Sequence, residues 1–212
     1  MTVAHSPDRP RYHHGNLREE LIAGALTATR SGGPDALSIR DSTRRAGVTP
    51  NAAYRHFRGR DDLLVATIDR IQASMAAEMD TEPADADPVE VLRAVGLGYI
   101  RFALAEPGWF GVAFTSVGSG DATPLPAPLA RLVAALDGLV TAGVLPEDHR
   151  AGAEWPCWSA VHGFTFLALH GPLRHRTTEE VLAAARRTVD TAIDGLLVAH
   201  RTTDTTGDPP HA

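Results

Sequence analysis

The chain is poor in several residue types, and each shortage excludes a class of protein. Its single cysteine, Cys157, has no partner for a disulfide within the chain, which excludes the disulfide-rich secreted scaffolds. The longest uninterrupted apolar runs, such as residues 109–114, are far shorter than the ~18 residues that a membrane span needs. No secretory apolar segment precedes Leu17. We therefore expect a cytoplasmic protein without a membrane partner.

Lysine is missing altogether. All 20 cationic side chains are arginine, against 26 Asp and Glu, and the formal net charge is -6. Either the base composition of the genome explains this bias, or the planar guanidinium fork is used to bind phosphate. The charge is also unevenly spread, since residues 1–65 carry ten Arg against seven acidic residues (+3) and residues 66–212 carry ten against nineteen (-9). A basic head on an acidic body leaves room for a nucleic-acid partner.

The patterning is helical almost throughout. With 212 residues, 43% of them hydrophobic, the chain suffices for one large or two small globular domains. Apolar residues recur at intervals of three and four, and the segment boundaries carry helix caps, whereas strand-type alternation of useful length is absent. We expect an all-α fold of about nine helices. The predicted organisation is a flexible arm (1–15), a helix-turn-helix domain (16–60), a C-terminal helical domain (61–201) and a disordered tail (202–212).

Capping residues predict where several helices begin. Asn16, Ser38, Thr49, Asp87 and Thr177 are N-cap candidates, and Pro follows directly at the first helical position in two of these cases. The predicted helices span about 16–30, 39–46, 49–57, 61–79, 88–105, 129–142, 150–170 and 178–201, with a short apolar segment at 109–114.

Residues 39–57 have the pattern of a helix-turn-helix. Two short helices are joined by Ala46, Gly47 and Val48, which supply a small residue, a turn glycine and a core aliphatic. This geometry places the second helix in a major groove, where side chains bond phosphates and base edges. The DNA contacts predicted from this helix and its flank are Thr49, Pro50, Asn51, Ala53, Tyr54, Arg55 and His56. Further phosphate contacts are expected from Arg40, Arg44, Arg58 and Arg60, while Arg9 and Arg11 of the arm either reach a minor groove or are simply solvated.

The flanks of this motif resemble the TetR family of transcriptional regulators. The segments YHHGNLREELIAGAL and GGPDALSIRDSTRRAGVTPNAAYRHFRGRDDLL are similar to the first four helices of that family over residues 12–64. The family's tyrosine, His-Phe pair and basic residue stand here as Tyr54, His56, Phe57 and Arg60. The resemblance implies an all-helical homodimer with an N-terminal DNA reader and a C-terminal domain that binds an inducer and dimerises. Farther on, Trp158 followed by Val161, His162 and Gly163 resembles the Trp/His-Gly (WHG) signature of one C-terminal subgroup.

Two positions depart from the family pattern. Ser42 stands where a branched aliphatic residue is usual, and Thr43 stands where alanine is usual. Both are expected to face the core of the reader, where a hydroxyl without a partner costs ~1–3 kcal/mol. Each hydroxyl must therefore bond a carbonyl one turn back, or the reader is less stable than its relatives.

The segment 150–170 is apolar on nearly every side, so a helix there must be buried on two faces. One face can pack on its own domain while the other, with a stripe of the last helix, packs on a second copy; burial within one domain is the alternative. The predicted dimerisation residues are Val161, Thr165, Leu169, Val189, Ile193, Leu196 and Leu197.

Most C-terminal aromatic residues fall where a pocket between helices can form, although a plain hydrophobic core would use them equally well. The predicted ligand-binding residues are Tyr99, Phe102, Trp109, Phe110, Phe114, Trp155, Trp158, His162 and Phe166. Such a ligand would be largely apolar or aromatic, with His162 as its polar contact.

Catalysis is not supported by the sequence. Cys157 and His162 are five residues apart, about 140° around a helix, so they cannot form a local nucleophile and base pair. The histidines lack metal-ligand spacing, and no Gly-rich phosphate loop follows a strand. We expect no enzyme and no cofactor. The favoured function is a homodimeric repressor that binds a palindromic operator on double-stranded DNA and is released by a small hydrophobic effector. One rival is a regulator that no ligand controls, and another is a helical small-molecule- or partner-binding protein without operator binding.

Overall fold

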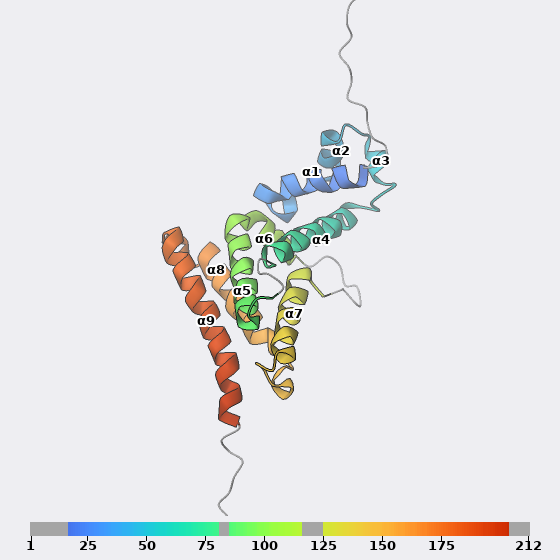
Figure 1. Cartoon of the computed structure of the whole chain (residues 1–212). Helices are drawn as coiled ribbons and strands as arrows, with labels where there is room; N and C mark the ends of the chain where they lie inside the picture. The colour runs from blue at the N-terminus through green and yellow to red at the C-terminus, as the bar shows by residue number, and fades with distance from the viewer. Residues whose placement is uncertain (1–16, 81–84, 116–124, 204–212) are drawn as a thin grey trace, which may run out of the picture. The chain divides into compact units, whose positions relative to one another are not determined.

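The computed structural model describes residues 17–80, 85–115 and 125–203, and within them every regular element is a helix (Figure 1). The nine α-helices and three short 3-10 segments of these ranges agree with the predicted all-α class. The contacts divide the chain into two units, residues 1–67 and 68–212. The arm (1–15), the cap at Asn16 and the end of the tail (204–212) lie outside the described residues.

The N-terminal unit is a small helical domain. It holds α1 (Leu17–Gly32), η1 (Pro34–Ala36), α2 (Ile39–Arg45), α3 (Pro50–Ala53) and the first half of α4 (Arg60–Glu78). Helix α1 packs against both α2 and α3. Its core consists of apolar side chains from α1, α2, α3, α4 and the loop before α4, chiefly Leu21, Ile22, Ala25, Ile39, Ala53, Phe57, Leu63 and Leu64.

Local chemistry sets the ends of the two short helices. The Ser38 side chain accepts a hydrogen bond from the Asp41 amide, as its predicted cap role requires. Gly47 follows α2 with φ 66°, a left-handed conformation that favours glycine. Helix α3 is shorter than predicted and ends at Ala53 rather than near Phe57. The amides of Arg55 and His56 bond carbonyls three residues back, so the chain continues as tight turns.

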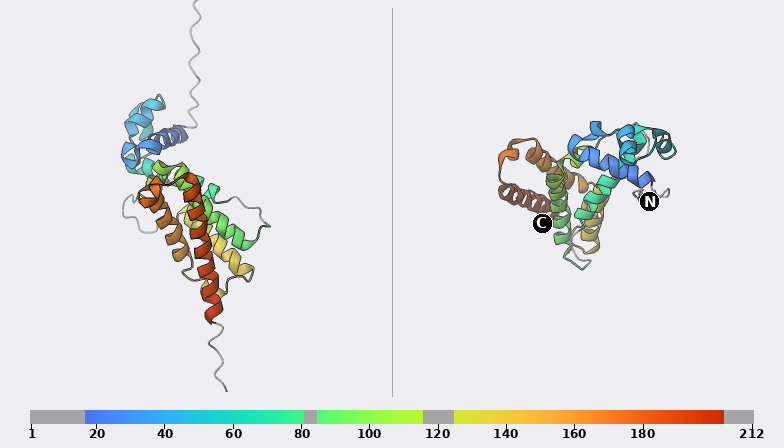
Figure 2. Two further views of the ribbon diagram at one scale, coloured as in Figure 1. Left: turned by 90° about the vertical axis from the view of Figure 1, so that its left-hand side faces the viewer. Right: turned by 90° about the horizontal axis from the view of Figure 1, so that it is seen from above.

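The helices of the C-terminal unit pack around one central helix, α5 (Pro88–Ala105). The unit also contains the second half of α4, α6 (Pro107–Ala113), α7 (Ala127–Thr141), η2 (Glu147–His149), α8 (Glu154–Leu169), η3 (Pro172–His175) and α9 (Thr178–Thr203). Helix α5 packs against α6, α7, α8 and α9, and the views of Figure 2 show α8 and α9 side by side. Because α5 is covered on several sides, most of its residues are buried.

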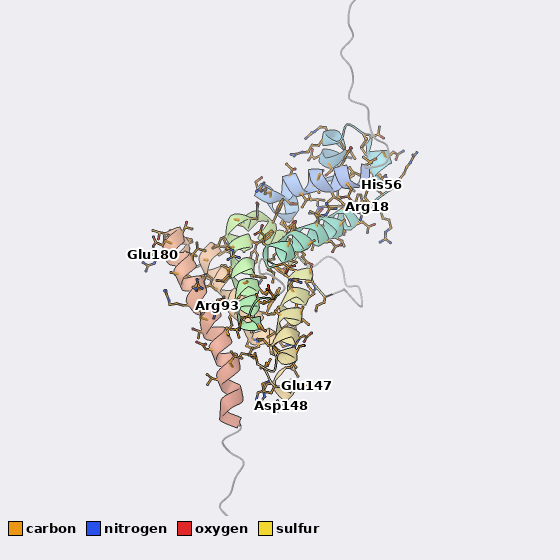
Figure 3. All side chains as sticks on the ribbon, in the orientation of Figure 1. Arg18, His56, Arg93, Glu147, Asp148 and Glu180 are labelled. Carbon is orange, nitrogen blue, oxygen red and sulfur yellow. The ribbon has the colours of Figure 1, made fainter. Side chains whose placement is uncertain are left out.

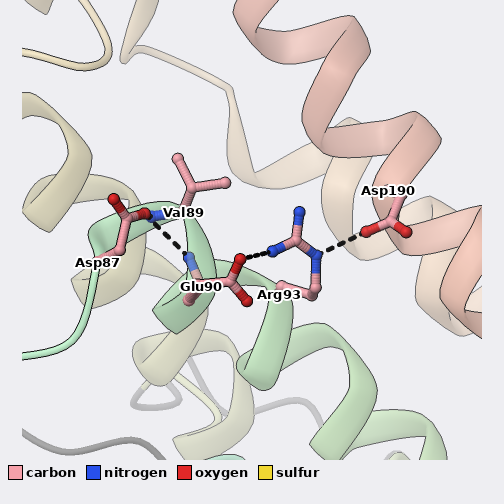
Figure 4. A network of polar contacts seen from close by, with 5 residues as sticks. All are labelled: Asp87, Val89, Glu90, Arg93 and Asp190. Carbon is pink, nitrogen blue, oxygen red and sulfur yellow. Dashed lines mark hydrogen bonds and ion pairs between the residues drawn. The ribbon is translucent and has the colours of Figure 1, made fainter.

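Two predicted caps of this unit are confirmed. The Asp87 carboxylate accepts from the amides of Val89 and Glu90 at the start of α5, and the Thr177–Glu180 pair forms a reciprocal capping box at the start of α9. One turn into α5, Arg93 bonds Glu90 and reaches across to Asp190 of α9 at 2.6 Å (Figure 4). This pair ties the central helix to the last one.

Other boundaries differ from the prediction. Helix α8 starts at Glu154 rather than Arg150, because Gly152 takes a left-handed conformation (φ 78°) that interrupts the helix. Helix α9 extends to Thr203, so the first two residues assigned to the tail belong to its last turn. Among the described residues, no helix combines the length and the apolar character that a bilayer crossing requires.

Candidate functional site

The turn between α2 and α3 presents a surface segment, residues 49–56, which we call the reading segment. The amide of Val48 returns to the Thr43 carbonyl at 3.0 Å, which closes the end of α2. Pro50 then opens α3, although the Thr49 side chain makes no capping bond. The side chains of Thr49, Pro50, Asn51, Tyr54, Arg55 and His56 are exposed. Figure 3 labels His56 on this segment.

Ala53 corrects the prediction. It is 1% exposed and packs into the core of the N-terminal unit, as does Phe57 one turn later. It therefore cannot touch a base edge, and its predicted DNA contact is wrong. Its burial fixes which side of α3 faces solvent. Arg18 of α1 covers the Phe57 ring, with its guanidinium carbon 5.4 Å from the ring centroid (Figure 3).

The arginine side chains around the reading segment differ in how strongly other groups of the protein bind their guanidinium groups. Arg40 and Arg44 are exposed, and Arg44 pairs with Asp41 at 2.8 Å on the surface of α2. Arg58 forms a two-pronged pair with Asp62, whose pKa is lowered chiefly by the hydrogen bond from this side chain. Such exposed pairs are weak and exchange readily for phosphate.

Arg60 is engaged inside its own unit. Its Nε donates to the Leu37 carbonyl at 3.2 Å and its Nη2 donates to the Pro34 carbonyl at 2.6 Å. These bonds tie the start of α4 to the η1 turn, and the side chain, which is 42% exposed, also has its Nη1 3.7 Å from Asp61 and its Nη2 4.0 Å from Asp35. We therefore propose a positioning role in the reader for Arg60, in place of the predicted phosphate contact.

Replacing Arg60 by alanine should lower the stability of the N-terminal unit by about 1–2 kcal/mol, because two carbonyls lose a charged donor. The salt dependence of DNA binding should stay unchanged, whereas Arg44→Ala should flatten it by about one charge. Thermal melts and binding at several salt concentrations measure the two effects. An Arg60→Ala protein that melts normally but has a flatter salt slope would return Arg60 to the phosphate contacts.

The two residues that depart from the family pattern, Ser42 and Thr43, have different surroundings in the core. The Thr43 hydroxyl donates to the Arg40 carbonyl at 2.9 Å, which satisfies it as expected. Ser42 lies against Gly24 of α1, where a Cβ added to the glycine would be 3.5 Å from the Ser42 Cα. The two helices therefore approach closely at these two small residues.

Five rings form an aromatic cluster in the C-terminal unit. Its members are Tyr99 of α5, Phe110 and Phe114 at α6, and Trp158 and His162 of α8. The Tyr99 hydroxyl and His162 Nδ1 are hydrogen-bonded at 2.7 Å. Burial raises the pKa of Tyr99 and lowers the pKa of His162, so both rings are neutral near pH 7.

A narrow cavity of about 20 Å³ adjoins this cluster, with room for about one water molecule. Tyr99 and Trp158 line both the cluster and the cavity. Further lining comes from Met79, which directly follows α4, and from apolar residues on α5, α7, α8 and α9, including Leu92, Val95, Gly96, Leu132, Cys157 and Ile193. Most of these residues could not be singled out as ligand contacts from the sequence, because aliphatic residues at helical spacing look the same in a core and in a pocket wall.

Four of the predicted ligand-binding residues lie elsewhere. Trp155 and Phe166 are each 57% exposed on α8, which excludes them from the cluster. Phe102 and Trp109 line a separate hollow beside Arg101. The error arises because α8 is apolar on every side, so its sequence does not indicate which aromatic residues face inward.

The same ambiguity affects the predicted dimer contacts. Val161, Thr165, Val189 and Ile193 are buried within their own unit, so their assignment to an interface is wrong. Leu169, Leu196 and Leu197 are half-buried. The outward face of α8 and α9 carries Trp155, Phe166 and Leu167 and a groove of mostly small residues. That groove is lined by Pro156, Ala160, Ala184, Arg187, Thr188, Thr191, Ala192, Gly195 and Leu196. We call this face the α8/α9 surface.

Each of the two units matches a model of a known protein family. Residues 21–67 match the model described as "Bacterial regulatory proteins, tetR family", and residues 92–192 match "Tetracyclin repressor-like, C-terminal domain". An uncharacterised helix-turn-helix-type transcriptional regulator of Mycobacterium tuberculosis, Rv0681, is 26% identical over 165 residues, which cover 77% of this chain and 75% of that protein.

Solved structures share the fold. A protein of unknown function from Rhodococcus sp. RHA1 has a TM-score of 0.72 at 28% identity, covering 89% of this chain and all of that one. A single-residue variant of TetR from Acinetobacter baumannii AYE, solved with minocycline, has a TM-score of 0.61 at 20% identity, covering 82% and 93% of the two chains.

The fold, the helix-turn-helix and these matches define a DNA-binding transcriptional regulator with an all-α architecture. The chain belongs to the TetR family. The Trp/His-Gly subgroup suggested by Trp158, His162 and Gly163 stays a prediction.

Proposed function

We propose that this regulator is a homodimeric repressor that reads a palindromic operator with residues 49–56 and leaves it when a small hydrophobic effector binds the C-terminal unit. The observation that carries the proposal is the two-sidedness of the reading segment. Its inward residue, Ala53, is buried, while Asn51, Tyr54 and Arg55 are exposed together. An amide, a phenol and a guanidinium are suited to base edges and phosphates.

A second copy is supported by the α8/α9 surface. Three large apolar side chains, Trp155, Phe166 and Leu167, are exposed there beside a groove of small residues. Exposed aromatic anchors next to a groove are typical of protein interfaces, and a two-fold pairing uses the same patch on both copies. A dimer would carry two reading segments, as a palindromic operator with half-sites about one turn of DNA, 34–36 Å, apart requires.

Effector control is supported by the aromatic cluster and its adjoining cavity. An effector can shift the protein away from DNA only through a difference in its affinity for the two states. A drug-sized ligand needs a pocket of ~300 Å³ or more, far above the cavity seen here, so binding must repack the rings. The minocycline complex of the A. baumannii TetR shows that a protein of this fold holds such a molecule.

The test is selection of an operator from random duplex DNA, followed by affinity measurements with Asn51→Ala and Tyr54→Ala. Each change should cost about 1–3 kcal/mol, and Asn51→Ala should also relax the base preference. Thr27→Ala, on the exposed face of α1, is the matched control and should bind like the wild type. Failure to select any site, or equal binding by all four proteins, would refute the proposed reading segment.

A further inference from the structure

The Phe114 ring is in contact with the rings of all four other members of the aromatic cluster. Its ring centroid lies 5.4 Å from that of His162, 5.7 Å from those of Phe110 and Trp158, and 6.3 Å from that of Tyr99. Three of the contacts are edge-on and the one with Tyr99 is stacked, which are the favourable geometries for ring pairs. The surrounding four rings thus form a site for one aromatic ring.

Phe114 is also the member best placed to move. Tyr99, Phe110, Trp158 and His162 all lie within helices, whereas Phe114 is the residue that ends α6, with φ −119° and ψ 19°. Its side chain is half-buried. Rotation of its side chain therefore requires no helix to unwind and newly exposes only part of a ring.

The chemistry around this place is neutral. None of the residues lining the adjoining cavity carries a formal charge, and within the cluster the polar atoms that meet are the Tyr99 hydroxyl and His162 Nδ1. A charged ligand would be desolvated there without a partner, which is strongly unfavourable. A ligand hydroxyl, by contrast, can join the Tyr99–His162 pair, because a hydroxyl both donates and accepts.

From this geometry we propose that Phe114 is a placeholder for an effector, and that the effector is an uncharged aromatic molecule bearing a hydroxyl group, which displaces the Phe114 ring and bonds the Tyr99–His162 pair. This inference rests on the proposed effector control and specifies its ligand class. Substituents on the ligand ring would extend into the cavity that Tyr99 and Trp158 share with the cluster.

The end of α6, where Phe114 lies, is hydrogen-bonded to α4. The carbonyl of the preceding residue, Ala113, accepts a hydrogen bond from the side-chain amide of Gln72 at 2.7 Å. Gln72 belongs to α4, the helix whose first turn carries Arg60. A displacement of Phe114 that also shifts the end of α6 would therefore act on this bond to α4, the helix that continues into the DNA reader.

The experiment measures binding by calorimetry on the whole 212-residue chain, without DNA, for 4-ethylphenol, ethylbenzene and 4-ethylbenzoate. Phe114→Ala should bind 4-ethylphenol at least tenfold more tightly than the wild type, because no ring has to be displaced. Ethylbenzene should bind more weakly than the phenol, and 4-ethylbenzoate should show at least tenfold weaker binding than the phenol. Phe102→Ala, which removes a buried ring outside the cluster, is the matched control and should gain nothing.

No gain in Phe114→Ala, an equal gain in Phe102→Ala, or equal binding of the benzoate and the phenol would overturn the proposal. Phe114→Leu keeps an apolar side chain at the end of α6 and guards against loss of folding; it should show a smaller gain with the same order of preference. Operator affinity is then measured separately. If the phenol binds as expected but DNA binding does not respond, the ligand site stands and effector control fails.

Discussion

Replacing Gly98 by alanine should destabilise the C-terminal unit by about 3 kcal/mol, the upper part of the range for overpacked cores. A Cβ at this position of α5 would lie 2.4 Å from the Glu78 carbonyl oxygen and 2.7 Å from the Met79 Cα. Both atoms belong to the backbone at the end of α4, so no side-chain rotation relieves the clash. Denaturant unfolding of the full chain measures the effect.

Gly138→Ala is the matched control for this change. Gly138 lies in α7, also in the C-terminal unit, and an added Cβ there meets no atom within 4 Å. Alanine should therefore raise stability by about 0.5–1 kcal/mol through its better helix propensity. The two glycine-to-alanine substitutions are thus expected to change the stability of the protein in opposite directions. Equal stability of Gly98→Ala and the wild type would show that the end of α4 and the middle of α5 are not packed as described.

Placing a charge on the α8/α9 surface should separate the proposed dimer. Phe166 is 57% exposed on α8, and in a two-fold interface the Phe166→Asp change introduces two carboxylates at once. Loss of an aromatic anchor costs about 2–4 kcal/mol, so the dimer dissociation constant should rise by roughly 100-fold or more. Operator affinity should fall with it, because a monomer binds one half-site at a time. Analytical ultracentrifugation and DNA titration measure the two quantities.

The control for this prediction is Leu125→Asp. Leu125 is an exposed leucine that precedes α7 and lies outside α8 and α9. The same charge placed there should leave the oligomeric state and DNA binding unchanged. A Phe166→Asp protein that sediments like the wild type would mean that the copies meet through another surface or do not meet at all.

Features set by neighbouring residues could be predicted from the sequence. Ser38 with Asp41, Asp87 with Pro88, and Thr177 with Glu180 all mark helix starts where the structure has them, because a capping bond joins residues two or three positions apart. The turn at Gly47 could be predicted in the same way, since a left-handed backbone conformation strongly favours glycine.

Features that depend on distant parts of the chain could not be predicted. The partners of Arg60 are carbonyls 23 and 26 residues away, and nothing near position 60 distinguishes a clamp from a phosphate contact. Helix α8 is apolar all round, so its pattern does not indicate which side faces inward, and Trp155 and Val161 were assigned to the wrong sides. The burial of Ala53 could not be predicted for a related reason, because a helix of four residues is too short to show a periodic pattern.

Helix α8 carries two tryptophans with opposite surroundings, three residues apart. Trp155 is exposed on the α8/α9 surface, while Trp158 packs edge-on against Tyr99 at 5.1 Å between ring centroids. On the proposed assembly, this one helix takes part in both the subunit contact and the wall of the ring site. If effector binding and the pairing of copies are coupled through it, the coupling acts equally in both directions, and the effector concentration that releases DNA would then depend on how many copies a cell holds.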